Sequence, residues 1–297
     1  MRIDLHTHTR ASDGTQSPSE LVHAAVAAGL DVLGLTDHDT TDGWAEASTA
    51  AAEVGLTLVR GIEISTRHLG RGAHLLAYLP DPTYAPLDEE LDRILDGRSS
   101  RVPAILDKLH ELDIPITAGD VRRASVGTAA TGRPHVADAL VTLGVVGHRD
   151  EAFRRFLNPG MPAYVDRYAA SLVEVLRLVG EAGGVPVLAH PWGRNGPSGM
   201  TEENLDELAG LGLAGLEVDH QDHSPEDRAA LRAIAGNLGL VVTGSSDHHG
   251  AGKVDHELGC NTTAPEEYDR LMELAATSAR ATGSAAEPPS VPPAPSS

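Results

Sequence analysis

The stretch that decides the fold is residues 1–14, which read M-R-I-D-L-H-T-H-T-R-A-S-D-G. Residues 2–5 predict a short strand that ends at His6 and His8. Side chains two residues apart on a strand point to the same face, so the two imidazoles can converge on one point. Imidazole is a common metal ligand, and Asp13 can add a carboxylate at the same rim. The stretch therefore predicts a metal site, the alternative being an exposed strand with merely polar histidines.

Composition limits the class of protein. The chain has 297 residues, 41% of them hydrophobic, which permits one or two domains with a sizeable core. Its net charge of −20 argues against a clamp on nucleic-acid phosphates, but not against a small nucleotide held by metals. The single cysteine excludes an intramolecular disulfide framework. We find neither a leader pattern nor a long apolar run, and expect a cytoplasmic protein with no membrane contact and no evident stable protein partner.

Short apolar runs alternate with helical patterns along much of the chain. This alternation, with short links, predicts parallel strands joined by right-handed crossovers. Seven such strands suit a closed, somewhat irregular barrel better than an open sheet, so we expect an α/β fold, a distorted (β/α)7 barrel. The predicted strands are residues 2–5, 32–36, 56–64, 73–78, 185–189, 213–218 and 240–244.

The middle of the chain departs from this pattern. Residues 81–169 lack clear strand runs and hold helical segments broken by Pro, Gly and Thr. We therefore expect a helical insertion, or cap, in a barrel built from residues 1–80 and 170–281. Residues 282–297 are rich in Pro, Ser and Ala, a composition that predicts a disordered tail.

Candidate metal ligands gather where the predicted strands end. In β/α barrels the chemistry collects at the carboxyl ends of the strands, and a random placement of histidines would not favour those positions. Some members could still be core or surface residues satisfied by hydrogen bonds. Beyond the first strand the candidates are Asp37 and His38, Glu63, His74 within the fourth strand, His190, and Asp247, His248 and His249.

Taken in order, these residues resemble the motifs of the PHP domain family (polymerase and histidinol phosphatase). The matching motifs are D-L-H-T-H-T with the later Asp13, T-D-H-D, G-I-E, A-H-P and S-S-D-H-H, and they cover about residues 1–80 and 185–265. The segment G-R-P-H at 132–135 resembles the subgroup that dephosphorylates nucleoside 3′,5′-bisphosphates and trims short RNA from its 5′ end. The tryptophan after A-H-P and the segment E-V-D-H-Q-D-H-S at 217–224 also resemble that subgroup.

The resemblance implies a centre of three divalent metal ions with nitrogen and oxygen ligands. This ligand set suits manganese, iron or zinc. Such ions would neutralise phosphate oxygens and lower the pKa of bound water, so that a metal-activated hydroxide attacks phosphorus. The implied ligand sets are His6, His8, Glu63 and Asp247; Glu63, His74 and His190; and Asp13, His38 and His249.

Four further residues are candidates for contact with the substrate. Arginine suits bidentate phosphate recognition, so Arg133 and its neighbour His135 would grip a phosphate if the insertion closes over the barrel mouth. The alternative for this pair is a helix-capping or surface role. Asp37 and His248 are candidate catalytic groups that would protonate the leaving oxygen, the alternative being that they orient a ligand imidazole.

We therefore expect a metal-dependent phosphoric monoester hydrolase acting on a small phosphorylated nucleoside, a 3′,5′-bisphosphate or an AMP-like compound. Trimming of short RNA 5′ ends is a related activity, since the same attack would serve a diester. Histidinol-phosphate phosphatase is one alternative, and the G-R-P-H segment argues against it. An amidohydrolase would need a strand-end lysine, which Lys108 and Lys253 do not supply. A non-catalytic metal-binding module is the last alternative, although no ligand position is lost.

Overall fold

The computed structural model describes residues 1–193, 196–197, 200–284 and 288–289. Its sheet has the strand order β1–β2–β3–β4–β6–β7–β8. A bridge between Thr7 and His248 joins the two ends of this order, so the sheet forms a nearly closed barrel, as predicted. The strands are β1 (Ile3–Thr7), β2 (Val32–Leu35), β3 (Thr57–His68), β4 (Arg71–Tyr78), β6 (Val185–Ala189), β7 (Gly215–Asp219) and β8 (Val241–Gly244), with the short β5 (Ala170–Ser171) paired to β3.

The fourth strand does not follow the predicted parallel arrangement. β4 runs antiparallel to both β3 and β6. The prediction was wrong here because Leu69 and Gly70, both at positive φ, turn the chain directly back and leave no room for a crossover helix. His74, near the start of β4, pairs with Ser65 and Ala189. The reversal therefore brings His74 to the rim where β6 ends.

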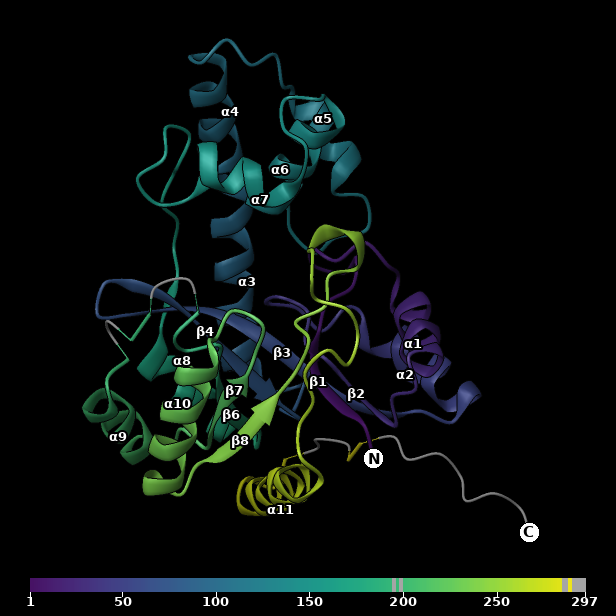
Figure 1. The fold of residues 1–297 in the computed structure, drawn as a ribbon, viewed down its shortest axis with the longest axis vertical. Coiled ribbons are helices and arrows are strands. Elements are labelled where there is room, and N and C mark those ends of the chain that lie inside the picture. The colour runs from purple at the N-terminus through teal and green to yellow at the C-terminus, as the bar shows by residue number, and fades with distance from the viewer. Residues whose placement is uncertain (194–195, 198–199, 285–287, 290–297) are drawn as a thin grey trace.

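Helices cover the outside of the barrel (Figure 1). At the start of the first of them, Ser17 and Glu20 form the capping box that their spacing in the sequence predicts. Figure 1 shows α1 and α2 on one flank and α9 and α10 on the other. These barrel helices are α1 (Pro18–Ala27), α2 (Trp44–Val54), α8 (Leu172–Glu181), α9 (Glu202–Gly210), α10 (Pro225–Leu238) and α11 (Pro265–Thr282).

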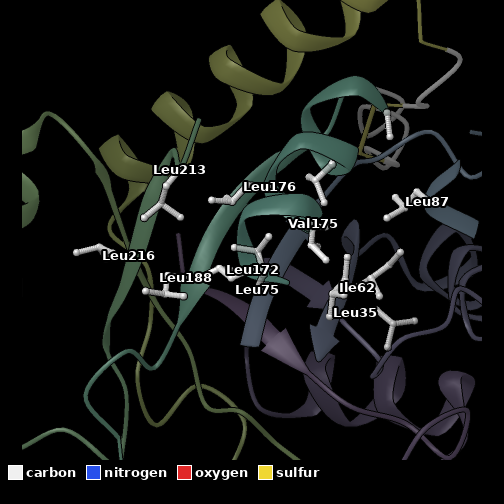
Figure 2. Packing of buried hydrophobic residues seen from close by; sticks show 14 of the residues in the cluster. Leu35, Ile62, Leu75, Leu87, Leu172, Val175, Leu176, Leu188, Leu213 and Leu216 are labelled. Atoms are coloured by element: carbon white, nitrogen blue, oxygen red, sulfur yellow. The ribbon is translucent and has the colours of Figure 1, made fainter. Parts of the chain in front are cut away.

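The main core lies between the sheet and these helices. Figure 2 shows Leu172 and Leu176 of α8 beside Leu75 and Leu188 of neighbouring strands. All four side chains are at most 2% exposed, and burying such a residue contributes about 1.5–3 kcal/mol. In a second buried cluster, Leu271 of α11 packs with side chains of β1, β4, β6 and β8. The rim therefore rests on a tightly packed scaffold.

The insertion has a hydrophobic core of its own. Its helices are α3 (Ala85–Ser100), α4 (Val102–His110), α5 (Ala118–Ala124), α6 (Arg133–Thr142) and α7 (Arg149–Ala152), followed by a π-helical turn, η1 (Phe153–Leu157). Ile105, Val136 and Leu157 are fully buried in a cluster separate from the barrel core. Figure 1 shows α3 rising from the sheet toward this group of helices. The domain boundaries at 81 and 169 remain a prediction, which this separate core supports.

The last barrel helix ends where the predicted tail begins. α11 ends at Thr282, and Gly283 follows in the left-handed conformation that commonly ends helices. Most of the predicted tail, residues 282–297, lies outside the described residues. Within the described part of the chain, no helix combines the length and apolar character needed to cross a membrane.

Arg98 of α3 forms hydrogen bonds that connect the insertion to the barrel. Its Nε donates to Asp39 Oδ2 at 2.6 Å, and its Nη2 donates to Ser65 Oγ at 2.7 Å. We expect the Arg98→Met variant to lose about 3 kcal/mol in free energy of unfolding, because the buried charge of Asp39 would lose its arginine and keep only the hydrogen bonds from Ser65. Urea unfolding measures this loss. The control is Arg177→Met, whose exposed ion pairs with Glu174 and Glu181 contribute little to stability. Equal losses would contradict the role of Arg98 in joining the insertion to the barrel.

Candidate metal and phosphate site

Histidines and carboxylates from several strands meet at one rim of the barrel. Among the described residues they form four overlapping groups here, with ligand atoms within 4.8 Å of one another in each. His190 joins the second group, since its Nε2 lies 3.0 Å from Glu63 Oε1. All nine predicted ligands are thereby brought together. The groups are His6, His8, Glu63 and Asp247; His38, Glu63 and His74; His8, Asp13, His38 and His249; and His220, Asp247 and His256, of which the last holds only one predicted ligand.

Glu63 lies at the centre of this cluster. Its Oε1 is 2.7 Å from His74 Nδ1 and 3.0 Å from His190 Nε2. Its Oε2 is 3.2 Å from the Nε2 atoms of both His6 and His8. The side chain is 2% exposed. One buried carboxylate thus faces histidines on two sides, the geometry that a bridging ligand needs.

The donor atoms of the cluster fit divalent metal ions. His6 Nε2 and His8 Nε2 lie 3.0 Å apart. Asp247 Oδ1 and His74 Nδ1 are buried and form no well-aligned hydrogen bond, although His74 Nδ1 lies close to Glu63. Buried carboxylate oxygens and imidazole nitrogens that converge in this way are costly unless a cation or protons lie among them. The set contains nitrogen and oxygen donors without thiolate, which suits manganese, iron or zinc.

The pKa values of two histidines reflect this environment. Burial lowers the pKa of His8, but contacts with Asp247 and Glu63 outweigh burial and raise it to about 9. Burial lowers the pKa of His38 to about 3, against the opposing charge of Glu63. His38 is therefore neutral at pH 7, as metal ligation requires. His8, in the metal-free site, instead takes up a proton, which supplies positive charge where a metal ion would bind.

A cavity of about 340 Å³ opens beside the cluster, and positively charged side chains line it. Three of them are paired with carboxylates: Arg98 with Asp39, Arg149 with Asp138, and Lys253 with Asp247. Arg71, Arg101, Arg133 and Arg167 also line the cavity, together with Asp150 and Asp222. The cavity thus places several guanidinium groups near the candidate metal ligands.

Arg101 is buried among other arginines of the cavity lining. Its side chain is buried, and its Nε has no hydrogen-bond partner. Burial and the charges of Arg133 and Arg167 lower the pKa of Arg101 to about 8. Burial and the charge of Arg98 likewise lower the pKa of Arg167 to about 10. Like charges crowded in this way destabilise one another, and a bound anion would relieve the repulsion.

The structure separates Arg133 from His135. Arg133 lines the cavity, with its Nη1 donating to the Leu157 carbonyl at 2.9 Å. His135 is 4% exposed; its Nδ1 accepts from the Gly132 N–H at 3.0 Å, and its Nε2 donates to the Ser12 carbonyl at 3.1 Å. Both ring nitrogens are engaged, so the predicted phosphate contact is not supported for His135. Its ring instead ties α6 to the loop after β1.

Asp37 and His248 are also turned away from the cavity. The fully buried Asp37 carboxylate accepts hydrogen bonds from Thr9 and Ser12. His248 Nδ1 donates to the His256 carbonyl at 2.7 Å, and its Nε2 lies 3.0 Å from a glutamine side-chain oxygen. Neither residue lines the cavity. The structure therefore does not support the predicted role in protonating the leaving oxygen, and shows bonds that brace the loops after β1 and β8.

Several functional candidates escaped the sequence analysis. Arg98 and Arg101 are three residues apart, a helical spacing that could have signalled a shared face. Lys253 Nζ contacts Asp247 Oδ2, and His220 Nε2 lies 3.2 Å from the same oxygen. His220 Nδ1 accepts from the Asp222 N–H, so its Nε2 carries a hydrogen and donates to Asp247. His220 is thus a hydrogen-bond donor to Asp247 here, and it also belongs to a candidate metal-binding group with Asp247 and His256.

Comparisons with known proteins agree with this site. The sequence model of the PHP domain matches residues 4–110. The chain is 36% identical over 248 residues to a 5′-3′ exoribonuclease from Haemophilus influenzae, covering 84% of this chain and 90% of the relative. It is 32% identical over 263 residues to a 3′,5′-nucleoside bisphosphate phosphatase from Chromobacterium violaceum, covering 89% and 92%. A solved structure of a predicted metal-dependent phosphoesterase from Bifidobacterium adolescentis matches with a TM-score of 0.87 at 37% identity, covering 92% and 96%.

Proposed function

We propose that this chain, which belongs to the PHP domain family and is a metal-dependent phosphoesterase, hydrolyses a phosphate monoester of a nucleoside that carries a second phosphate. The observation that carries the proposal is the shared cavity. Nine converging histidine and carboxylate residues lie beside it, and arginines line it, among them the buried Arg101. A substrate with two phosphates could reach both groups at once.

Three divalent ions would be held by the ligand sets that the family resemblance implies. When bound, such ions neutralise phosphate oxygens and lower the pKa of water so that it can attack phosphorus. Glu63 would be a ligand common to two of the sets, and Asp13, His38 and His249 would hold the third ion. The neutral His38 ring and the 3.2 Å distance between His249 Nε2 and Asp13 Oδ1 support this third position.

The arginines would bind the phosphate that is not cleaved. Arg101, Arg133 and Arg167 each present a planar guanidinium that can hold phosphate oxygens through two hydrogen bonds. The Chromobacterium violaceum relative is named for nucleoside 3′,5′-bisphosphates, which have two phosphates on one ribose. A small nucleotide of this kind also agrees with the acidic net charge of the chain, which disfavours long nucleic acids.

Short RNA 5′ ends are a second candidate substrate. The Haemophilus influenzae relative is named a 5′-3′ exoribonuclease. A phosphodiester oxygen accepts hydrogen bonds from a guanidinium as a phosphate monoester does. Arg101 and its neighbours could therefore hold the phosphate that links the first nucleotide to the rest of a short strand.

Phosphate release from a small substrate panel tests this proposal. The panel, assayed with manganese, contains adenosine 3′,5′-bisphosphate, AMP, histidinol phosphate and a 5′-phosphorylated short RNA, with a His6→Ala, His8→Ala double variant as control. We expect turnover of the bisphosphate or the RNA and none by the double variant. Turnover of histidinol phosphate alone would refute the substrate class and leave the metal site standing. Manganese binding without any turnover would favour a non-catalytic module.

A further inference from the structure

We infer that Glu217 is a positioning residue that holds two proposed metal ligands, His6 and His190, in place and thereby sets the metal affinity of the site. The inference rests on the metal centre proposed above, and it concerns a residue outside the nine ligands. Glu217 lies on β7, between apolar neighbours in the sequence G-L-E-V-D, and is fully buried. A buried carboxylate inside an apolar strand is costly unless its oxygens are bonded.

Both oxygens of Glu217 are bonded to residues at the ends of other strands. His6 Nδ1 donates to Oε1 at 2.9 Å, and the hydroxyl of Ser245 contacts the same oxygen. The backbone N–H of His190 donates to Oε2 at 2.9 Å. These partners come from β1, from the segment after β8 and from the segment after β6. One carboxylate therefore links three neighbouring parts of the rim.

The bond to His6 fixes the state of its ring. Because Nδ1 carries the hydrogen that Glu217 accepts, the lone pair of Nε2 is left to face the other ligands. His6 Nε2 lies 3.2 Å from Glu63 Oε2 and 3.5 Å from Asp247 Oδ1. A carboxylate on the far nitrogen of a metal-binding histidine fixes the tautomer and the ring orientation that metal binding needs.

The bond to His190 supports a turn with unusual backbone geometry. His190 has a φ of 30°, in a region that residues other than glycine rarely adopt. Side chains from β7 and the segment after it hold this turn at both ends. Glu217 accepts from the N–H of His190, and His223 Nε2 accepts from the N–H of Trp192 at 3.2 Å. Glu217 therefore acts on His190 through the backbone, while the His190 ring stays directed at Glu63.

The Glu217→Gln variant tests the hydrogen bonds of Glu217 without changing the size of the side chain, because the amide has nearly the shape of the carboxylate. An amide has one oxygen, so one of its two ends must present an NH2 group. Placed at the Oε1 position, that group opposes the N–H of His6 and favours the wrong tautomer. Placed at the Oε2 position, it opposes the backbone N–H of His190. Either orientation disturbs one proposed ligand.

Manganese binding to the full chain, stripped of metal with a chelator, tests the inference. We expect Glu217→Gln to weaken manganese binding about 10–100-fold, the range for removing a residue that orients a metal-binding histidine. The rise in melting temperature on adding manganese should shrink accordingly. The matched control is Glu90→Gln in α3, another buried and hydrogen-bonded glutamate, which contacts Arg93 and Tyr168 instead of the site. This control should bind manganese as the unsubstituted chain does.

Unchanged manganese affinity in Glu217→Gln would overturn the inference, as would an equal loss in Glu90→Gln. If Glu217→Gln does not fold, the variant Ser245→Ala takes its place, because it keeps the charge of Glu217 and removes one of its hydrogen-bond donors. We expect Ser245→Ala to bind manganese a few-fold more weakly. Unchanged manganese binding by this variant would overturn the inference. Failure of the substrate proposal is distinguishable, because it would appear as manganese binding without turnover. Absence of manganese binding by the unsubstituted chain would overturn both proposals.

Discussion

Replacing Glu63 by glutamine is expected to lower phosphate release from adenosine 3′,5′-bisphosphate at least about a thousandfold. The two oxygens of Glu63 lie within 3.2 Å of ring nitrogens from His6, His8, His38, His74 and His190. An amide removes the negative charge on which a bridging ligand depends and turns a donor toward these nitrogens. Metal ions contribute several kcal/mol to stabilising charge in the transition state, and about 4 kcal/mol corresponds to a thousandfold in rate.

Steady-state kinetics with excess manganese measures this loss, together with the metal content per chain after dialysis. Glu46→Gln is the control, since Glu46 is an exposed residue of α2 that bonds to Ser19. We expect the control to keep its rate within about twofold, because exposed substitutions away from a site have small effects. A Glu63→Gln variant within tenfold of the unsubstituted rate would show that Glu63 is not central to the reaction.

Local patterns were sufficient to predict much of this site. The spacing of His6 and His8 depends only on the two-residue repeat of a strand, and His190 follows an apolar run that reads directly as a buried strand. Glu63, predicted at a strand end, lies instead within β3, because that strand continues to His68. The carboxyl ends of parallel strands meet at one edge, so the sequence order of the motifs placed them together. The same logic was incomplete for His74, because the tight turn at Gly70 reverses β4.

Long-range partners account for what the sequence did not show. Glu217 bonds to His6, 211 residues away, and no spacing rule connects two such positions. Arg98 and Arg101 are both buried arginines, but their partners differ. Asp39 pairs with Arg98, whereas Arg101 Nε has no hydrogen-bond partner. That difference depends on how α3 meets the barrel. A sequence pattern identifies a residue type and its periodicity, whereas the pairing of charges depends on the tertiary contact.

The G-R-P-H segment shows how secondary structure divides a motif. Arg133 and His135 read as one phosphate-binding pair in the sequence. α6 begins at Arg133, and residues two apart on a helix do not face the same direction. Arg133 consequently lines the cavity, while His135 points into the loop after β1 and bonds to Ser12. The helix start therefore explains why one of two neighbouring residues remains a candidate for phosphate binding.

Arg101→Met is expected to weaken the reaction while stabilising the chain, a combination that would identify Arg101 as a substrate contact. A hydrogen bond to a charged group contributes about 1.5–3 kcal/mol, so kcat/KM for adenosine 3′,5′-bisphosphate should fall about 10–100-fold. The value for AMP should fall much less, because AMP lacks the second phosphate. In phosphate-free buffer the free energy of unfolding should rise by about 1 kcal/mol, since methionine fills the space without the buried charge.

Kinetics on the two substrates and urea unfolding together decide this prediction. Arg122→Met on α5 is the control, because Arg122 is exposed and does not line the cavity, and it should change neither kinetics nor stability appreciably. Equal losses for both substrates would place Arg101 at the cleaved phosphate instead of the second one. A fall in the free energy of unfolding would indicate a structural role for Arg101. Its packing and hydrogen bonds would then stabilise the fold by more than its repulsion from the neighbouring arginines destabilises it. Stability and substrate selectivity moving in opposite directions would show that these arginines are kept close together, at a cost to stability, in order to bind an anion.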